Sequence, residues 1–251
     1  MAYRKTKPKV ASFSFAGEDK KGIISTITSF FFYNNCNILD IDQRILDNYL
    51  IMNTLVDFSD IDEPVEAFLS KLKKVTHQKL KMKLKVQLLG LKEPKKIALL
   101  VSKEDHCADQ IIKDIKAGKI KGQVKLMLGN HDQLAGLAKK HKIPFHHFPS
   151  VKKKLHEEQI LKHLDKEDID LVVLARYMQI LSPDFNFRYE GRIINIHPSL
   201  LPAFPGPRGY HQAFNKGVDF VGVTAHFVTT DLDEGPIICQ DAFKVNKIKH
   251  K

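Results

Sequence analysis

The chain has 251 residues, of which 43% are hydrophobic and 27% are charged. This composition is typical of a globular protein, and the length allows one large domain or two ordinary ones. No segment reaches the roughly 18 consecutive apolar residues that a membrane helix needs. No long apolar run follows the basic first residues, so we expect a cytoplasmic chain with neither a secretory signal nor a membrane partner.

Charge and cysteine content exclude two further classes of protein. The formal net charge of +11 raises the question of nucleic-acid binding. The lysines are spread along the whole chain without a nucleic-acid motif or interleaved aromatic residues, so we expect no nucleic-acid partner. Cys36, Cys107 and Cys239 are too few and too scattered for a disulfide framework, and we expect reduced thiols.

Residues 1–90 show the pattern of a small domain of their own. Ile23, Ile27 and Phe31 recur at helical spacing, and residues 79–89 alternate lysine with apolar residues, as a half-exposed strand does. In chain order the patterns predict a strand at 10–15, a helix at 23–33, strands at 37–46 and 49–58 with a turn at 47–48, a helix at 60–75 and a strand at 79–89. This βαββαβ order is that of the ferredoxin-like split unit.

A second pattern fills residues 91–251, after a linker at 90–96. Buried strands alternate there with helices, which predicts a doubly wound, mostly parallel sheet. The expected strands lie at 97–101, 124–128, 171–174 and 193–196, the expected helices at 108–117, 133–141 and 156–164, and a last strand-like segment at 237–245.

The strand that ends near His197 carries the chemistry. Side chains alternate along a strand, so Asn195 and His197 point the same way at its carboxyl end. Ligands of open α/β sheets bind at that end. An amide donor beside an imidazole can polarise a carbonyl group and transfer a proton. The loop at 229–236 adds a carboxylate, Asp233, to this pair.

These motifs resemble a known family. Asn195-Ile196-His197-Pro198-Ser199-Leu200-Leu201-Pro202, followed by His226-Phe227-Val228 and by the 231–238 segment, is similar to the formyltransferase-fold enzymes that use 10-formyltetrahydrofolate. The resemblance implies three roles. Asn195 donates to the oxyanion, His197 stabilises its charge and helps to protonate N10, and Asp233 holds the water and accepts its proton. It also places His226 in a supporting position.

The same resemblance implies a folate pocket. Its expected residues lie in two segments, namely Met178, Gln179, Ile180 and Leu181, and Thr229, Thr230, Asp231 and Leu232. No cofactor is implied, because the folate is itself the substrate. The neighbouring His146 and His147 lack the helical or cysteine partners of a zinc site, so we expect no metal.

Three further features distinguish the members of this family. The loop at 102–107 contains no glycine, whereas the glycinamide ribonucleotide transformylases of this family have a glycine-rich loop there that holds the substrate phosphate. The segments at 129–132, 143–149 and 175–183 resemble the formyltetrahydrofolate deformylases. The opening Gly17-Glu18-Asp19-Lys20-Lys21-Gly22-Ile23 and Cys36-Asn37-Ile38 resemble an ACT domain, which implies a homo-oligomer and an amino-acid effector.

The resemblance therefore implies hydrolysis of 10-formyltetrahydrofolate to formate and tetrahydrofolate, which supplies formate for purine biosynthesis and balances the folate pools. Two alternatives stay open, a formyltransferase acting on an amine and an inactive folate-binding protein. The motif Pro198-Ser199-Leu200-Leu201, which follows His197, has the sequence found in the transferases. The sequence also ends soon after residue 245, where the relatives continue, and we expect this to leave apolar surface uncovered.

Overall fold

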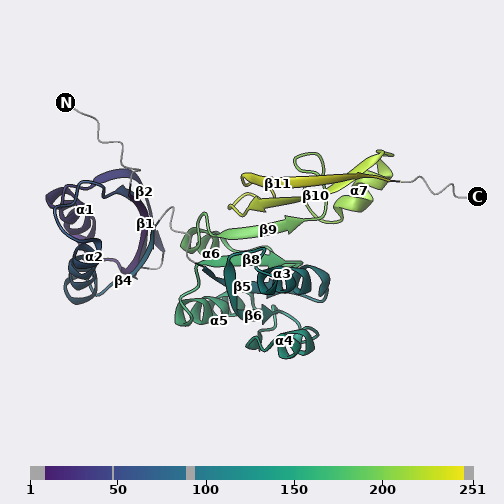
Figure 1. The fold of residues 1–251 in the computed structure, drawn as a ribbon, viewed down its shortest axis with the longest axis horizontal. Coiled ribbons are helices and arrows are strands. Elements are labelled where there is room, and N and C mark those ends of the chain that lie inside the picture. Colours follow the sequence, from purple (N-terminus) through teal and green to yellow (C-terminus); the bar gives the residue numbers. More distant parts are fainter. Residues whose placement is uncertain (1–8, 47, 89–93, 246–251) are drawn as a thin grey trace, which may run out of the picture. The chain divides into compact units, whose positions relative to one another are not determined.

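The computed structural model describes residues 9–46, 48–88 and 94–245, and the chain divides into two compact units, residues 1–92 and 93–251 (Figure 1). The predicted boundary fell between residues 90 and 91. Residue 47 of the predicted turn, residue 89 of the predicted strand and residues 90–93 of the predicted linker lie outside the described residues. Each unit is described below by itself.

The first unit is one antiparallel sheet with two helices on the same face (Figure 1). The sheet has the order β2-β3-β1-β4. Its strands and helices are β1 Val10–Glu18, α1 Ile23–Tyr33, β2 Asn37–Leu46, β3 Tyr49–Asp57, α2 Val65–Lys74, the π-helical turn η1 Val75–Lys79, and β4 Lys83–Leu88. The predicted βαββαβ order is confirmed.

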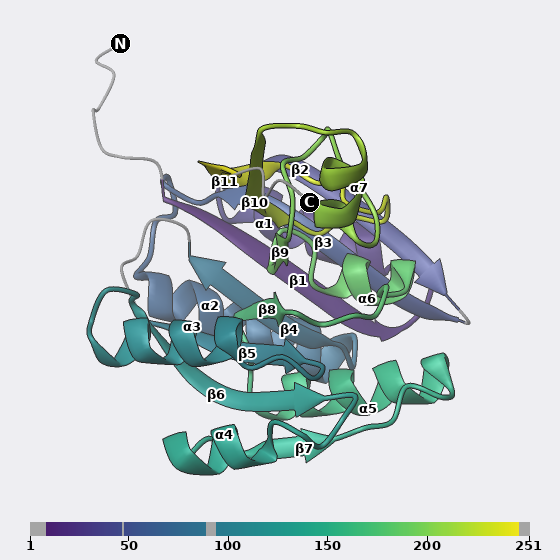
Figure 2. The same ribbon diagram turned by 90° about the vertical axis from the view of Figure 1, so that its right-hand side faces the viewer.

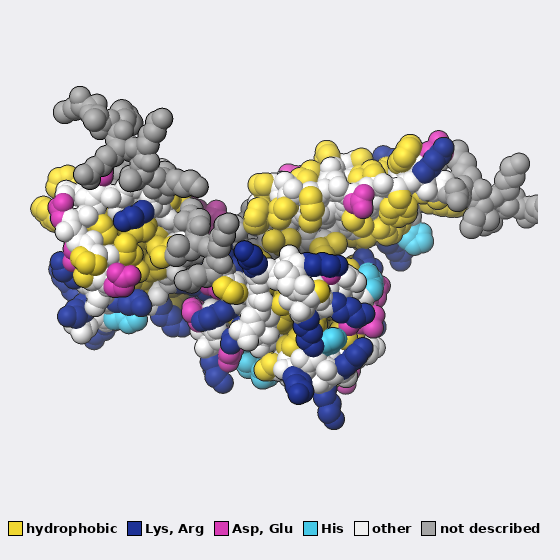
Figure 3. Space-filling model, viewed as in Figure 1, with side chains coloured by type: hydrophobic (Ala, Val, Ile, Leu, Met, Phe, Trp, Pro, Cys, Tyr) yellow, Lys and Arg dark blue, Asp and Glu magenta, His cyan; other side chains and the backbone are white. Residues whose placement is uncertain are grey.

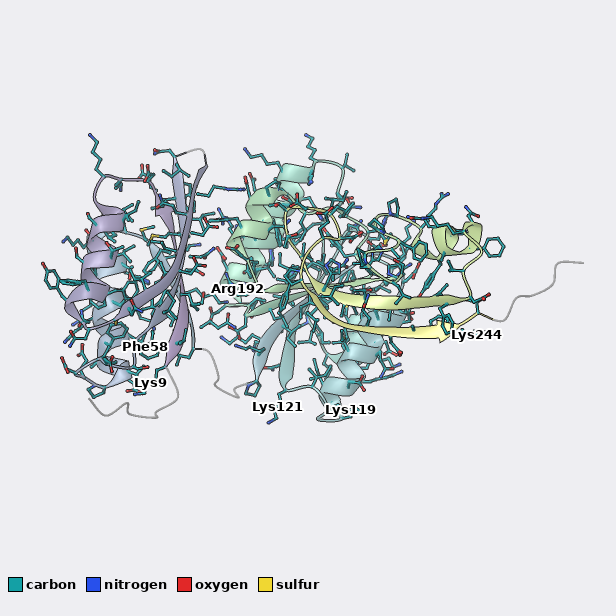
Figure 4. The ribbon with its side chains drawn as sticks, turned by 90° about the horizontal axis from the view of Figure 1, so that it is seen from above. Lys9, Phe58, Lys119, Lys121, Arg192 and Lys244 are labelled. Atoms are coloured by element: carbon teal, nitrogen blue, oxygen red, sulfur yellow. The ribbon has the colours of Figure 1, made fainter. Side chains whose placement is uncertain are left out.

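Aromatic packing forms the core of this unit. Phe13 and Phe15 lie on the buried face of β1, and α1 presents Phe31 to them, with ring centroids 5.2 Å from Phe13 and 6.4 Å from Phe15. Phe68 of α2 closes the cluster against Phe13. The helix α1 begins directly after Gly22, whose φ of +88° favours glycine. Just before β1, the Lys9 carbonyl accepts a hydrogen bond from the backbone N–H of Phe58, which follows β3, over 2.9 Å (Figure 4).

Two elements of this unit start at other residues than predicted, and β1 runs to Glu18 rather than to residue 15. The second helix begins at Val65 rather than at residue 60, because Pro64 disfavours helical geometry in the residue before it and is itself the residue that precedes the helix. The last strand begins at Lys83 rather than at residue 79. The helical turn continues through η1 instead, where the Thr76 hydroxyl donates to the Leu72 carbonyl at 2.6 Å.

The second unit contains a seven-stranded sheet of order β11-β10-β9-β8-β5-β6-β7. Its strands are β5 Lys95–Val101, β6 Gly122–Gly129, β7 Phe145–His147, β8 Leu171–Ala175, β9 Ile193–His197, β10 Phe220–Phe227 and β11 Ile237–Lys244. Neighbouring strands from β7 to β9 are parallel, and β10 is antiparallel to both β9 and β11. Figure 2 shows β8, β5, β6 and β7 following one another across the sheet. The predicted doubly wound, mostly parallel sheet is confirmed.

Helices cover both faces of the parallel strands, with α3 and α5 on opposite sides of β5 (Figure 1). The helices are α3 His106–Lys116, α4 Ala135–His141, α5 Lys153–Lys166, α6 Pro183–Arg188 and α7 Gly209–Asn215. Along β5, Ala98 and Leu100 join the core that includes α5, whereas Leu99 and Val101 join the core that includes α3 and α4. A buried run of apolar residues is therefore the expected pattern for this strand.

Four elements lie where the sequence predicted none, namely β7, α6, α7 and β10. The first three are too short for a periodic pattern to be recognised. In β10 the buried face consists of Gly222, Thr224 and His226, so apolar periodicity is missing from the side that packs inward. The predicted linker also extended two residues too far, because Lys95 and Lys96 already pair in β5.

Two observations concern the surface. Hydrophobic side chains gather over β10 and β11 in Figure 3. Phe220 of β10 and Ile237 and Phe243 of β11 are exposed. The strand β11 forms the edge of the sheet and ends at Lys244 (Figure 4). Among the described residues, no helix is both long and apolar enough to cross a membrane.

The strand order defines where a ligand should bind. From β5 the chain proceeds through β6 to β7 on one side, then returns to β8 and continues through β9 on the other. The order thus reverses between β5 and β8, and open α/β sheets bind ligands beside such a reversal, at the carboxyl ends of the strands.

Candidate active site

The pairing of β9 with β10 brings the central polar residues together. Asn195 on β9 lies opposite His226 on β10, and His197 lies opposite Thr224. The loop that follows β10 carries Asp233 back to these strands. Asp233 Oδ2 lies 3.3 Å from His197 Nδ1, and Asp233 Oδ1 lies 3.6 Å from His226 Nε2. Side chains predicted from three separate motifs thus meet at one point.

The carboxylate of Asp233 is held in place by backbone as well as by histidine. The amide N–H of Gly206 donates to Asp233 Oδ2 over 2.8 Å, and the Asp233 side chain is only 6% exposed. Its φ of +59° lies in the left-handed region, which aspartate and asparagine tolerate better than most residues. Gly206 was not predicted as a site residue, although its Pro-Gly-Pro surroundings mark a turn.

Each of the two histidines donates to a backbone carbonyl, but through a different ring nitrogen. His197 Nε2 lies 2.9 Å from the Phe204 carbonyl, and because a carbonyl only accepts, this nitrogen carries a proton. His226 Nδ1 likewise donates to the Phe227 carbonyl over 2.9 Å. In a neutral His226 ring, Nε2 is then an acceptor, and the Asn195 Nδ2 amide lies 3.2 Å from it. This bond uses one N–H group of Asn195 and leaves the other free for a ligand.

A cavity of about 320 Å³ opens beside this cluster. Every residue predicted for the site lines it, namely Asn195, His197, His226 and Asp233, the segment Met178, Gln179, Ile180 and Leu181, and the segment Thr229, Thr230, Asp231 and Leu232. Leu181 is buried in the core, whereas Met178 and Ile180 are 60% and 63% exposed and form an open apolar wall. Such a wall suits a flat aromatic ligand with one polar end.

Asn186 and Arg208 also line the cavity and were not predicted from the sequence, whereas Arg176 and Tyr177 lie in the 175–183 segment whose resemblance to the deformylases was noted. Arg176 forms a two-point ion pair with Glu104, at 2.8 Å from Nε and 3.0 Å from Nη2. The Glu104 carboxylate raises the pKa of Arg176, and Arg176 in turn lowers the pKa of Glu104. Arg176 also lines a neighbouring cavity of about 220 Å³ with Lys103.

Two buried polar residues of α5 support the wall at 176–182. His156 is 3% exposed and its Nε2 is hydrogen-bonded to the Tyr177 hydroxyl. Burial lowers the pKa of His156 and raises the pKa of Tyr177, so both stay uncharged at neutral pH. Glu157, 6% exposed, accepts from the Ser182 backbone N–H over 2.8 Å. Sequence alone gives no signal for these contacts, since helical charged residues usually face solvent.

The chemistry of the remaining candidate residues is limited. Within the described part of the chain, no group of three or more histidine, cysteine or acidic side chains is arranged to hold a metal ion. Cys107 is half-buried, and this burial raises the pKa of its thiol, which opposes a nucleophilic thiolate.

The arrangement defines a class of site. A carboxylate beside an imidazole, with an amide donor next to them in a partly apolar cavity, can bind water, transfer protons and stabilise an oxyanion. The pattern of the formyl transferase family matches residues 95–250, and that of the ACT domain family matches residues 13–87.

Curated relatives give the same result over most of the chain. The formyltetrahydrofolate deformylase of Bacillus subtilis is 36% identical over 91% of this chain and 77% of the relative. That of Synechocystis is 38% identical over 91% of this chain and 80% of the relative. The chain therefore belongs to the formyl transferase family, in the group of the formyltetrahydrofolate deformylases.

Solved structures agree with this assignment. A formyltetrahydrofolate deformylase from Pseudomonas syringae has a TM-score of 0.61 at 27% identity, with 98% of this chain and 82% of that chain covered. One from Burkholderia mallei has a TM-score of 0.59 at 32% identity, covering 95% and 85%. A phosphoribosylglycinamide formyltransferase from Bacillus halodurans has a TM-score of 0.59 at 37% identity, but covers only 62% of this chain, and 83% of its own length.

Proposed function

We propose that this chain hydrolyses 10-formyltetrahydrofolate to formate and tetrahydrofolate. The observation that carries the proposal is the position of Asp233 between His197 and His226, beside Asn195, in a cavity lined by both predicted folate segments. The family assignment supports the same reaction. No cofactor enters it, because the folate is the substrate and water is the second reactant.

The first chemical step is attack of water on the formyl carbon. Asp233 accepts a proton from the attacking water, and its position is fixed by the Gly206 N–H bond. The formyl oxygen becomes an oxyanion as the C–O bond forms. The N–H group that Asn195 does not share with His226 donates to this oxyanion, and an oxyanion donor of this kind typically contributes about 10²–10³-fold in rate.

The second step breaks the bond between the formyl carbon and N10. The leaving nitrogen needs a proton, and His197 supplies it from Nδ1, since Nε2 is held by the Phe204 carbonyl. Asp233, 3.3 Å from Nδ1, passes the proton taken from water back to the imidazole. The sum is one water consumed, one of its protons moved to N10, and formic acid released, which ionises to formate and a proton, with no oxidant or reductant.

Water rather than an amine is the proposed acceptor. The loop that follows β5 has the sequence Ser102-Lys103-Glu104-Asp105-His106-Cys107, without a glycine to let its backbone approach a phosphate. The Arg176 guanidinium beside it is already paired with Glu104. A second candidate function is transfer of the formyl group to an amine. Two observations favour it, namely the transferase-like sequence Pro198-Ser199-Leu200-Leu201 and the fold shared with the Bacillus halodurans formyltransferase.

The test is formate release by the purified full chain with 10-formyltetrahydrofolate and no amine. We expect formate and tetrahydrofolate in equal amounts, and a loss of about 10²–10³-fold in the Asn195→Ala variant. Formation of a formylated amine only when a glycinamide sugar phosphate is added would favour the transferase. Binding of folate without turnover in either assay would favour a binding protein.

The first unit supplies regulation in this proposal. An ACT domain at residues 13–87 is a ligand-binding fold, and we propose an amino-acid effector and self-association for it. An amino-acid panel in the formate assay tests the effector, since an effector must change the rate or the KM.

A further inference from the structure

Asn186 is a polar residue in an apolar part of the folate cavity wall. It lies on α6 between Phe185 and Phe187, which are 0% and 7% exposed, and is itself 6% exposed. A buried amide costs free energy unless both its donor and its acceptor form hydrogen bonds. The packing of α6 gives no reason for an amide here, because the neighbouring residues bury aromatic rings.

The amide group of Asn186 is only half satisfied. Nδ2 donates to the backbone carbonyl of Thr229 over 2.9 Å. This bond fixes the orientation of the amide, because only its nitrogen can donate to a carbonyl. Oδ1 is buried and has no hydrogen-bond partner among the described residues. The chain thus keeps a buried acceptor without a partner, and an unsatisfied buried acceptor costs free energy.

The bond to Thr229 joins the two walls of the cavity. Thr229 begins the segment 229–232, while α6 directly follows the segment 178–181. The start of α6 is itself fixed, since Ser182 caps the helix and its backbone donates to buried Glu157. Within the described residues, the other hydrogen bonds of residues 229–232 are made inside their own loop.

We propose that Asn186 is a positioning residue that holds the 229–232 wall at the distance from the 178–181 wall that the pterin ring requires. This inference rests on the proposed function, because it names the pterin as the group between the walls. Asn186 sets substrate affinity by this account and takes no part in proton transfer. Its unpaired Oδ1 is the cost of placing a donor opposite the Thr229 carbonyl.

Two variants separate positioning from packing. Asn186→Leu keeps the approximate shape and removes both polar atoms, and Asn186→Asp keeps the size and removes the donor to Thr229. We expect KM for 10-formyltetrahydrofolate, and Kd for a folate analogue in a fluorescence titration, to rise about 2- to 10-fold in both, the equivalent of one hydrogen bond. We expect kcat to stay within about twofold, and Tm of Asn186→Leu to be unchanged or higher.

A local measurement checks the loop itself. Amide hydrogen exchange in residues 229–232 should be faster in both variants than in the wild type, because the loop has lost its bond to α6. The control is Asn34→Leu in the first unit, which removes a comparable amide-to-carbonyl bond, from Asn34 Nδ2 to the Phe30 carbonyl at 2.7 Å. It should lower Tm and leave KM and the exchange of 229–232 unchanged.

The outcomes are distinguishable. A lowered Tm with unchanged KM, Kd and loop exchange in both Asn186 variants overturns the inference and makes Asn186 a packing residue. A loss confined to kcat also overturns it. Absence of both formate release and folate binding in the wild type refutes the proposed function, and the inference with it, whereas a wild type that turns over while the variants keep its KM refutes the inference alone.

Discussion

The side-chain amide of Asn195 donates to Nε2 of His226 over 3.2 Å, between residues that lie directly opposite each other on β9 and β10. His226 can accept because its other ring nitrogen donates to the Phe227 carbonyl. A backbone carbonyl thus determines the tautomer of His226, and the tautomer determines which way the Asn195 amide faces. The oxyanion donor of the proposed mechanism is oriented by a residue that need not touch the substrate.

Removing the His226 imidazole should slow the reaction, because the Asn195 amide loses the bond that orients it. We expect His226→Leu to lower the rate of the chemical step about 10- to 100-fold, part of the loss of about 10²–10³ expected when the oxyanion donor itself is removed in Asn195→Ala. The measurement is single-turnover formate release. Since His226 acts through Asn195, the double variant should be about as slow as Asn195→Ala alone.

The double variant also provides the contradicting result. If the two losses multiply in full, His226 acts through another group, and Asp233, whose Oδ1 is 3.6 Å away, is the candidate.

Replacing Asp233 by asparagine should separate chemistry from binding. Asparagine tolerates the left-handed backbone at this position, and its oxygen can still accept from the Gly206 N–H. It cannot accept a proton from water, so the rate of hydrolysis should fall about 10²–10⁴-fold. Affinity for a folate analogue should stay within about tenfold, because the 178–181 wall is unchanged. The measurements are single-turnover formate release and a fluorescence titration.

A near wild-type rate in Asp233→Asn would remove this residue from the proton-transfer steps. Weakened binding with a normal chemical step would make it a residue of the pocket wall. Glu234→Gln, in the same loop but exposed and outside the cavity lining, is the matched control and should change neither quantity substantially.

The sequence predicted the centre of the site because that centre depends on local geometry. Asn195 and His197 are two residues apart on one strand, so their shared direction follows from the pleat alone. The alternation of strands and helices predicted the sheet whose carboxyl edge they occupy. The roles of Asn195, His197 and Asp233 in hydrolysis stay predictions, although the structure brings their side chains together.

The supporting residues were not predictable for a physical reason. Glu157 contacts Ser182, and Asn186 contacts Thr229, across 25 and 43 residues of sequence. Which pairs meet depends on how α5 and α6 pack on the sheet, and no periodic pattern encodes that packing. The helix α6 has only six residues, too few for such a pattern to be recognised.

Stability should depend on pH through His156. Burial lowers the pKa of this side chain in the folded chain below its usual value near 6.5. The unfolded chain therefore takes up a proton first as the pH falls below about 6.5, so stability is lost from there down to the lower folded pKa. In His156→Gln, whose side chain can still accept from the Tyr177 hydroxyl, Tm should fall less between pH 7.5 and pH 5.

Thermal unfolding at a series of pH values measures this difference. His211→Gln, at an exposed position, is the control and should show the wild-type slope. If Tm falls equally with pH in wild type and in His156→Gln, another group governs the loss of stability at low pH. His146, whose pKa is also lowered by burial, is the candidate.

Self-association should depend on the open edge of the first sheet. The strand β2 lies at that edge and exposes Leu39, Ile41 and Ile45, at 49%, 42% and 53%. Unpaired edge strands with apolar side chains commonly pair with a second copy, and a lysine on the edge prevents this. We expect Ile41→Lys to lower the molar mass in light scattering. Val151→Lys, at an 89% exposed position in the second unit, should leave the mass unchanged. An equal mass for wild type and Ile41→Lys would exclude this edge as the interface.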